Sequence, residues 1–189
     1  MRIVSGKAGG LRIASPPGSA RPTTDRVREA IFSSLGDQVE GARILDLFAG
    51  SGAMGMEALS RGAALAVFVE RDSRAAATIR SNLASTRLAD SGEVACAEVL
   101  AWLARETRVG IGQDAQAGES GAAGRPFGIA FADPPYLFDQ WEELLALIEA
   151  EVLVAESDRE IVGAVGWESI RARRYGGTVV TVMRRTKVR

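Results

Sequence analysis

The chain has 189 residues, 47% of them apolar and 25% charged, which is the composition of one globular domain with a substantial core. It contains no histidine and a single cysteine, Cys96, so Ser-His-Asp triads, Cys-His dyads, internal disulfides and histidine or multi-thiolate metal sites are excluded. Catalysis must therefore rely on carboxylates, backbone groups or a cofactor, and we expect no metal.

The net charge of −1 conceals an uneven distribution. Residues 1–30 hold six Lys or Arg against two acids, residues 167–189 hold seven against one, and residues 31–166 therefore carry a net −11. Basic ends favour either solubility or an anionic partner. The sequence shows neither the run of about 18 apolar residues that a membrane helix needs nor the apolar core of a signal peptide. We therefore expect a cytoplasmic protein.

The N-terminal part is predicted to be a small extension. Residues 1–22 should form it, with a hairpin of short strands at 2–5 and 11–14 around GKAGG, before a main domain over 23–189. A helix should open the main domain, capped by Thr24 or Asp25.

Strands and helices then alternate along the chain. The predicted strands are 43–48, 65–70, 93–98 and 127–132, and the helices between them are 54–61, 73–88 and 99–106. This alternation indicates a parallel sheet with helices on both faces, which binds ligands at the carboxyl ends of its strands.

The remaining segments are less regular. The glycine-rich stretch 107–126 is interpreted as a flexible surface insertion, with a lid as the functional alternative. Residues 141–150 resemble a helix and 151–156 a strand, although no turn signal separates them. Residues 170–185 predict two antiparallel strands around a Tyr-Gly-Gly turn.

A glycine loop follows the strand over 43–48. Gly50, Gly52 and Gly55 have the spacing of a dinucleotide-binding loop, and Glu70 lies twenty positions beyond the first glycine. Asp46 decides between cofactors, because its charge would repel a pyrophosphate and attract an ammonium group. S-adenosyl-L-methionine carries such an ammonium and no phosphate.

Two further acids end predicted strands. Glu70 can accept hydrogen bonds from both ribose hydroxyls of an adenosine cofactor. Glu98 can accept one from the adenine amine, or it is a solvated loop acid. Gly50 and Gly52 are expected to leave room for close approach of the cofactor.

The stretch FADPPYLFD ends the strand over 127–132 with an acid, two prolines and an aromatic ring. The Asp133 carboxylate and the Pro134 carbonyl can each accept one N–H of a nucleobase amine, which directs the nitrogen lone pair at a methyl donor. Pro134 and Pro135 keep the loop extended, and Tyr136 can stack on a base swung out of its helix. The plainer interpretation is a turn in which Asp133 caps a helix and Tyr136 enters the core.

Four segments carry a resemblance to a known family: DLFAGSGAMGMEALSRGA, FVERD, DPPY and RPTTDRVREAIFSSL. Through them the sequence resembles the RsmD family of bacterial methyltransferases over almost its whole length. The resemblance implies a class I methyltransferase fold with α/β architecture: a seven-stranded, mostly parallel sheet whose last strand is antiparallel. It implies S-adenosyl-L-methionine as cofactor and the exocyclic N2 of a guanine in 16S rRNA as acceptor, at position 966. The 30S subunit or its assembly intermediate would be the partner of a monomeric enzyme.

The resemblance also implies roles for individual residues. Catalysis would fall to Asp133, Pro134, Pro135 and Tyr136. Cofactor contacts would come from Asp46, Phe48, Gly50, Gly52, Glu70, Arg71, Glu98 and Asp133. Substrate RNA would be contacted by Arg12, Arg21, Thr24, Asp25, Arg26 and Arg28, unless these arginines only form a solvated helix face.

Four other activities remain open from the residues. A DNA amino-methyltransferase shares the D-P-P-Y motif, although 189 residues leave little room for a target-recognition domain. A glutamine-amide methyltransferase would resemble N-P-P-Y. A non-catalytic RNA-binding module would need no intact cofactor loop, and an NAD enzyme would need a loop without Asp46.

Overall fold

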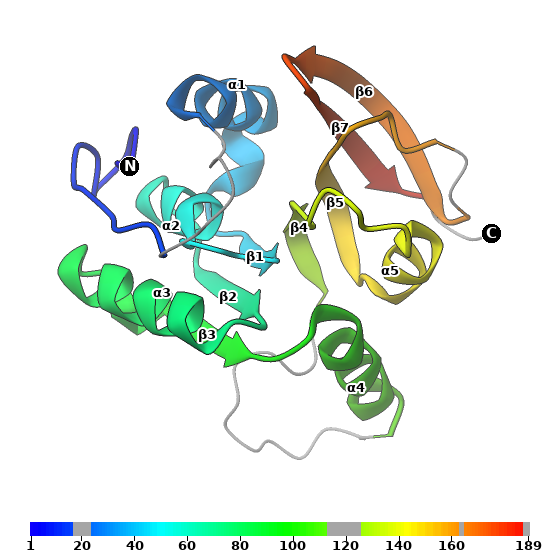
Figure 1. Ribbon diagram of the computed structural model, residues 1–189, viewed down its shortest axis with the longest axis horizontal. Helices are drawn as coiled ribbons and strands as arrows, with labels where there is room; N and C mark the ends of the chain where they lie inside the picture. The colour runs from blue at the N-terminus through cyan, green and yellow to red at the C-terminus, as the bar shows by residue number, and fades with distance from the viewer. Residues whose placement is uncertain (17–23, 113–125, 163–164, 187–189) are drawn as a thin grey trace.

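The computed structural model describes residues 1–16, 24–112, 126–162 and 165–186. Its centre is a sheet of seven strands in the order β3-β2-β1-β4-β5-β7-β6 (Figure 1). The strands are β1 (Arg43–Leu47), β2 (Leu65–Glu70), β3 (Gly92–Cys96), β4 (Phe127–Ala132), β5 (Ala150–Ser157), β6 (Trp167–Tyr175) and β7 (Thr178–Arg185). Strands β1 to β5 pair in parallel and β7 is antiparallel to both of its neighbours, which confirms the predicted fold.

Helices cover both faces of the sheet (Figure 1). They are α1 (Asp25–Leu35), α2 (Ala53–Ser60), α3 (Ser73–Ser85), α4 (Val99–Gly112) and α5 (Trp141–Leu147), with short 3-10 turns at Gly36–Val39 and Ala89–Ser91. Side chains of α1, α2 and α3 share one core with Ile44, Phe68 and Phe131, whereas α4 and α5 share the other with Leu45, Val67 and Leu153. Burial on both faces explains why the central strands are continuous apolar runs.

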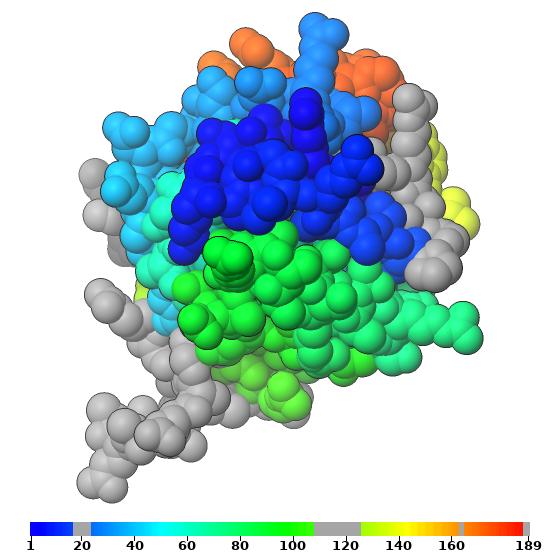
Figure 2. Space-filling model, turned by 90° about the vertical axis from the view of Figure 1, so that its left-hand side faces the viewer, coloured from blue at the N-terminus to red at the C-terminus, as the bar shows by residue number. Residues whose placement is uncertain are grey.

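The N-terminal segment lies against α2 and α3 (Figure 2). The predicted hairpin is present in a short form: one antiparallel bridge joins Arg2 and Arg12, and the Ile3 and Ile13 amides donate across it to the Leu11 and Met1 carbonyls. The fully buried Glu57 accepts hydrogen bonds from the backbone amides of Val4 and Ser5 at 2.6 and 3.0 Å. Asn82 accepts one from the Ala14 amide at 2.8 Å. Buried carboxylate and amide groups thus attach this short hairpin to α2 and α3.

Element boundaries differ from the predictions mainly at helix and loop junctions. Helix α4 continues to Gly112, six residues into the predicted insertion, whose remaining residues 113–125 lie outside the described chain. The strand β3 ends at Cys96, so Glu98 is not at its end. The helix and strand predicted for 141–156 are present, and only Ile148 and Glu149 separate them.

Each helix among the described residues is too short or too polar to cross a membrane.

Candidate active site

Three acids meet at the carboxyl edge of the parallel strands. Asp46 pairs in register with Phe68 and Phe131. Glu70 and Asp133 each lie two residues beyond these partners, so all three acids belong to the same face of the sheet, because strand side chains alternate. This is the face covered by α1, α2 and α3. Residues far apart in sequence are therefore assembled into one acidic site.

Asp46 is buried in β1, with 4% of its surface exposed. Its Oδ2 accepts a hydrogen bond of 2.9 Å from the backbone amide of Gly55, in the first turn of α2. Desolvation raises the pKa of Asp46 to about 8; the Gly55 bond opposes this, and the charges of Asp133 and Glu70 add to it. An acid with this pKa is mostly protonated at neutral pH, and a cation placed beside it would restore its charge.

Glu70 ends β2 and holds the backbone of two loops. Its Oε2 accepts from the Gly50 amide and its Oε1 from the Asp72 amide, both at 2.8 Å. Each carboxylate oxygen has two acceptor sites, so one on each remains for a diol. Glu70 therefore fixes the glycine loop and keeps the capacity for the ribose role that the sequence predicts.

The glycines of the loop serve different purposes. A Cβ at Gly50 would meet only the Phe48 carbonyl oxygen, at 3.9 Å, so this position faces open space. A Cβ at Gly52 would lie 2.8 Å from Met56 Cε and 3.1 Å from Ile79 Cγ2. Gly52 is thus required by the packing of α2 and α3 and by its φ of 76°, rather than by room for a ligand. Gly50 alone fits the predicted close approach.

The D-P-P-Y loop is held against the glycine loop by aromatic contacts. The Phe138 amide donates to the Pro135 carbonyl at 2.8 Å, which turns the chain back. The Phe138 ring then packs edge-on against Phe48 at 5.3 Å and against Trp141 at 5.5 Å. Phe48 has a φ of 56°, a backbone conformation that residues other than glycine rarely adopt. It serves as the bridge between the two loops.

Asp133 and Pro134 have the features expected of an amine acceptor pair. Asp133 keeps part of its surface open to solvent, yet desolvation by the surrounding protein raises its pKa to about 6. In the described chain, no donor reaches the carbonyl oxygen of Pro134. Beside them lies a shallow pocket lined by Asp133, Pro134, Pro135, Tyr136, Phe138, Trp141, Glu156, Ser157, Asp158 and Thr178.

Two large side chains at this loop are exposed. Tyr136 has 78% of its surface exposed and Leu137 has 93%, so Tyr136 does not enter the core. The plainer interpretation of D-P-P-Y as a turn with a buried tyrosine is therefore wrong. Leu137 and Phe138 were not predicted as site residues, although both directly follow D-P-P-Y in the sequence and form an apolar pair there.

The other predicted cofactor residues lie at the rim. Glu98 is exposed, and its Oε2 accepts from the Ala101 amide at 2.9 Å, so this oxygen caps α4. Arg71 is exposed, directly after Glu70. Their contacts with an adenosine remain predictions.

The predicted RNA-contacting residues fall into three groups. Arg12, Thr24 and Arg26 are exposed, and Asp25 is half-buried. Arg21 lies outside the described residues. Arg28 is only 1% exposed, and its Nη2 donates to the Arg2 carbonyl at 2.6 Å and to Asp25 Oδ1 at 2.7 Å. The prediction that Arg28 contacts RNA is therefore wrong: its side chain joins α1 to the N-terminal segment.

No cluster of three or more possible metal ligands occurs among the described residues.

The sheet order, together with a glycine loop after β1 and acids at the ends of β1 and β2, defines a class I methyltransferase fold. A family model described as "conserved hypothetical protein 95" matches residues 1–184. The chain belongs to this family, which is that of RsmD and YlbH, the small-subunit rRNA methyltransferase family.

Individual relatives agree with this assignment. The Bacillus subtilis protein YlbH, named as a candidate rRNA methyltransferase, is 39% identical over 85% of this chain and 84% of its own. Ribosomal RNA small subunit methyltransferase D of Escherichia coli is 37% identical over 79% of this chain and 67% of its own. The solved structure of the Escherichia coli protein yhhF, described as a candidate methyltransferase, has a TM-score of 0.80 and 32% identity, covering 98% of this chain and 97% of its own.

Proposed function

We propose that this protein transfers a methyl group from S-adenosyl-L-methionine to the exocyclic N2 of a guanine in 16S rRNA, at position 966. The observation that carries the proposal is the position of Asp133 on the same sheet edge and face as Asp46 and Glu70, directly before a Pro134 carbonyl that accepts no hydrogen bond within the described chain. The names of the relatives support ribosomal RNA as the substrate class.

The residues of the site fit the cofactor. The open space at Gly50 admits a ligand close to the backbone. Buried Asp46 offers a carboxyl group whose charge an ammonium would stabilise, and Glu70 offers acceptor sites for ribose hydroxyls. When bound, this cofactor supplies a methyl group on a positively charged sulfur.

The chain itself orients the acceptor. The Asp133 carboxylate and the Pro134 carbonyl each accept one N–H of the guanine amine, which turns the nitrogen lone pair toward the methyl group. The methyl group that the cofactor would supply would leave its sulfur as it bonded to this nitrogen, and the nitrogen would then release one proton. Asp133, with a pKa of about 6, can accept that proton and pass it to solvent. Tyr136 supports the extruded base by stacking.

The test uses radiolabelled cofactor with 30S subunits, or their assembly intermediates, from cells that lack any equivalent enzyme. Nucleoside digestion and mass spectrometry should then identify labelled N2-methylguanosine in 16S rRNA, and Asp133→Ala protein should give none. Label in N6-methyladenosine or in duplex DNA would refute the substrate while keeping the amine-binding loop. Label at another guanine would refute only the position.

A further inference from the structure

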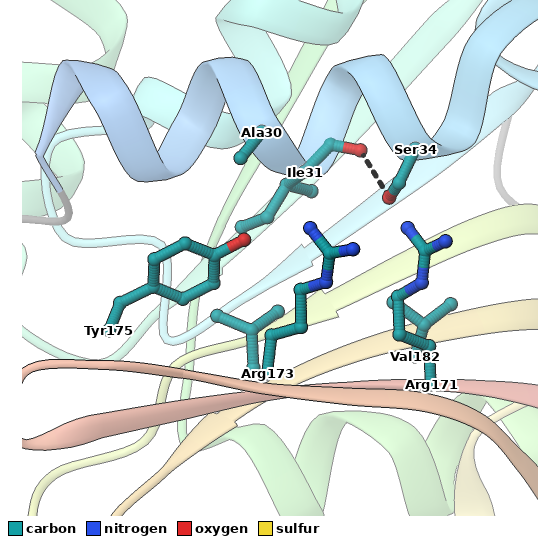
Figure 3. A pocket seen from close by; sticks show the side chains of 8 residues that line it. Ala30, Ile31, Ser34, Arg171, Arg173, Tyr175 and Val182 are labelled. Carbon is teal, nitrogen blue, oxygen red and sulfur yellow. Dashed lines mark hydrogen bonds between the residues drawn. The ribbon is translucent and has the colours of Figure 1, made fainter.

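A second hollow lies away from the acids, between α1 and the hairpin of β6 and β7 (Figure 3). Ala30, Ile31 and Ser34 of α1 form one wall, and Arg171, Arg173 and Tyr175 of β6 form the other. The apolar side chains of Val180 and Val182 form its floor. We call this hollow the α1–β6 groove.

Within the described chain, Arg171 and Arg173 of the groove have no salt-bridge partner. Both are exposed, and Figure 3 shows their guanidinium groups side by side, directed from β6 toward α1. No carboxylate of the described residues forms a salt bridge with either. Other arginines of this hairpin have partners: Arg174 donates to the Asp158 carbonyl, and Arg185 stacks on Trp167. Arg171 and Arg173 are thus free to bind an external anion.

The geometry of the strand gives these charges a regular spacing. Residues two apart on a strand lie about 7 Å from each other and point to the same face. This spacing is similar to that of successive phosphates along a nucleic-acid strand. Within β6 and β7 five arginines stand against one acid, Glu168, so the local charge favours a polyanion.

The groove is connected to the active site through the tip of the hairpin. Tyr175, at the end of β6, pairs with Thr178, at the start of β7. Tyr175 lines the groove, whereas Thr178 lines the pocket that contains Asp133 and Tyr136. A nucleic-acid strand whose base enters this pocket can therefore continue past the tip of the β6–β7 hairpin into the groove.

We propose that the α1–β6 groove binds the phosphate backbone of substrate RNA on one side of the target nucleotide, with Arg171 and Arg173 each contacting one phosphate. The choice of RNA as occupant rests on the proposed function, and the choice of a phosphate backbone rests on the unpaired arginines and their spacing.

The test measures the binding of labelled 16S rRNA at several salt concentrations. The double variant Arg171→Gln/Arg173→Gln should lower the slope of log affinity against log salt by about 0.7 to 0.9 for each phosphate that the groove no longer binds, and should weaken binding roughly tenfold at about 0.1 M salt. Arg174→Gln, on the same strand but the opposite face, is the matched control and should bind as the wild type does. Arg171→Lys/Arg173→Lys should keep most of the slope.

The outcomes separate this proposal from the proposed function. Equal slopes for the wild type and the double Gln variant would overturn the groove proposal, even if the wild type methylates 16S rRNA. A reduced slope in the double variant alone would support it, even if methylation of another acceptor refuted the proposed function. Unchanged RNA binding together with weaker binding of polyglutamate would also overturn it, because the groove would then fit an acidic protein.

Discussion

At the scale of single residues, the distinctive feature of the site is two aspartates whose pKa values are raised. The protein has no histidine, and the pKa values of Asp46 and Asp133 are raised to about 8 and about 6. Carboxyl groups therefore titrate in the range where histidine usually does. Both shifts come mainly from desolvation, so they depend on the folded site.

Cofactor affinity should rise with pH up to about 8. Binding of an ammonium beside Asp46 lowers the pKa of its carboxyl, so binding releases a proton below pH 8 and affinity falls by up to tenfold for each unit of decreasing pH. Calorimetry in buffers of different ionisation enthalpy measures this release. Asp46→Asn should remove it and leave only the titration of the ligand's own amine. Equal proton release by both proteins would contradict the placement of Asp46.

Asp133→Ala should lower the rate of methyl transfer by about 10² to 10³, which removes detectable product, and should leave cofactor affinity within about twofold, because Asp133 faces the substrate amine. Single-turnover rates and calorimetry test the two parts separately. Asp133→Asn keeps the shape and removes the charge, so it is the matched control for packing. A parallel loss of cofactor binding in both variants would place Asp133 in the cofactor site instead.

Glu70→Gln should weaken cofactor binding before it affects the rate at saturation. Both oxygens of the Glu70 carboxylate accept a hydrogen bond, from the backbone amides of Gly50 and Asp72. A glutamine side chain keeps only one of these acceptors, so one of the two loops loses its hydrogen bond. We expect roughly a tenfold loss of affinity, from about 1.4 kcal/mol. Thermal unfolding with and without cofactor serves as the check, and unchanged affinity would remove Glu70 from the ribose role.

At the scale of elements, the helices and strands of the parallel core were readable from the sequence. The strands at 65–70 and 127–132 have the predicted bounds, because continuous apolar runs report burial on both faces. Thr24 caps α1 as predicted. The prediction that Arg28 contacts RNA was wrong because it depends on contacts between distant parts of the fold. Arg28 lies on the core side of α1, where the Arg2 carbonyl and Asp25 are its partners.

Substitutions of the two arginines of α1, Arg26 and Arg28, should differ in their effects on stability and on RNA binding. Arg28→Ala removes the hydrogen bonds to Asp25 and to the Arg2 carbonyl and should lower the free energy of unfolding by roughly 2 kcal/mol. Arg26→Ala, at an exposed position, should leave stability within about 0.5 kcal/mol and lower the salt dependence of RNA binding. Urea unfolding and RNA titration distinguish them. Equal stability of the two variants would show that the Arg28 contacts add nothing.

At the scale of the whole molecule, one buried acid joins the N-terminal segment to the sheet domain. Glu57 is fully buried and accepts from the Val4 and Ser5 amides, while Arg61 pairs with it at 2.7 Å. Ile3, Ala8 and Ile13 also share the core of α1 and α2. The N-terminal segment is therefore integrated into the main core rather than appended to it.

Glu57→Ala should lower the free energy of unfolding by roughly 3 kcal/mol, because two buried amides and one arginine lose their common partner. In the Glu57→Ala variant, hydrogen exchange should be faster at the Val4 and Ser5 amides than at the amides of β1. Asp72→Ala, which removes an exposed cap of α3, is the comparison and should destabilise the protein less than Glu57→Ala does. Uniform exchange across the protein would instead mean that the segment opens only with global unfolding.

This arrangement also sets an order of events during synthesis. The amides of Val4, Ser5 and Ala14 leave the ribosome first, but their acceptors Glu57 and Asn82 follow 52 to 68 residues later. Closing such long loops is entropically costly until the helices that carry the acceptors have folded. Residues 4–14 thus reach their folded positions late, and a nascent chain that stops before α3 lacks Asn82, the acceptor of the Ala14 amide.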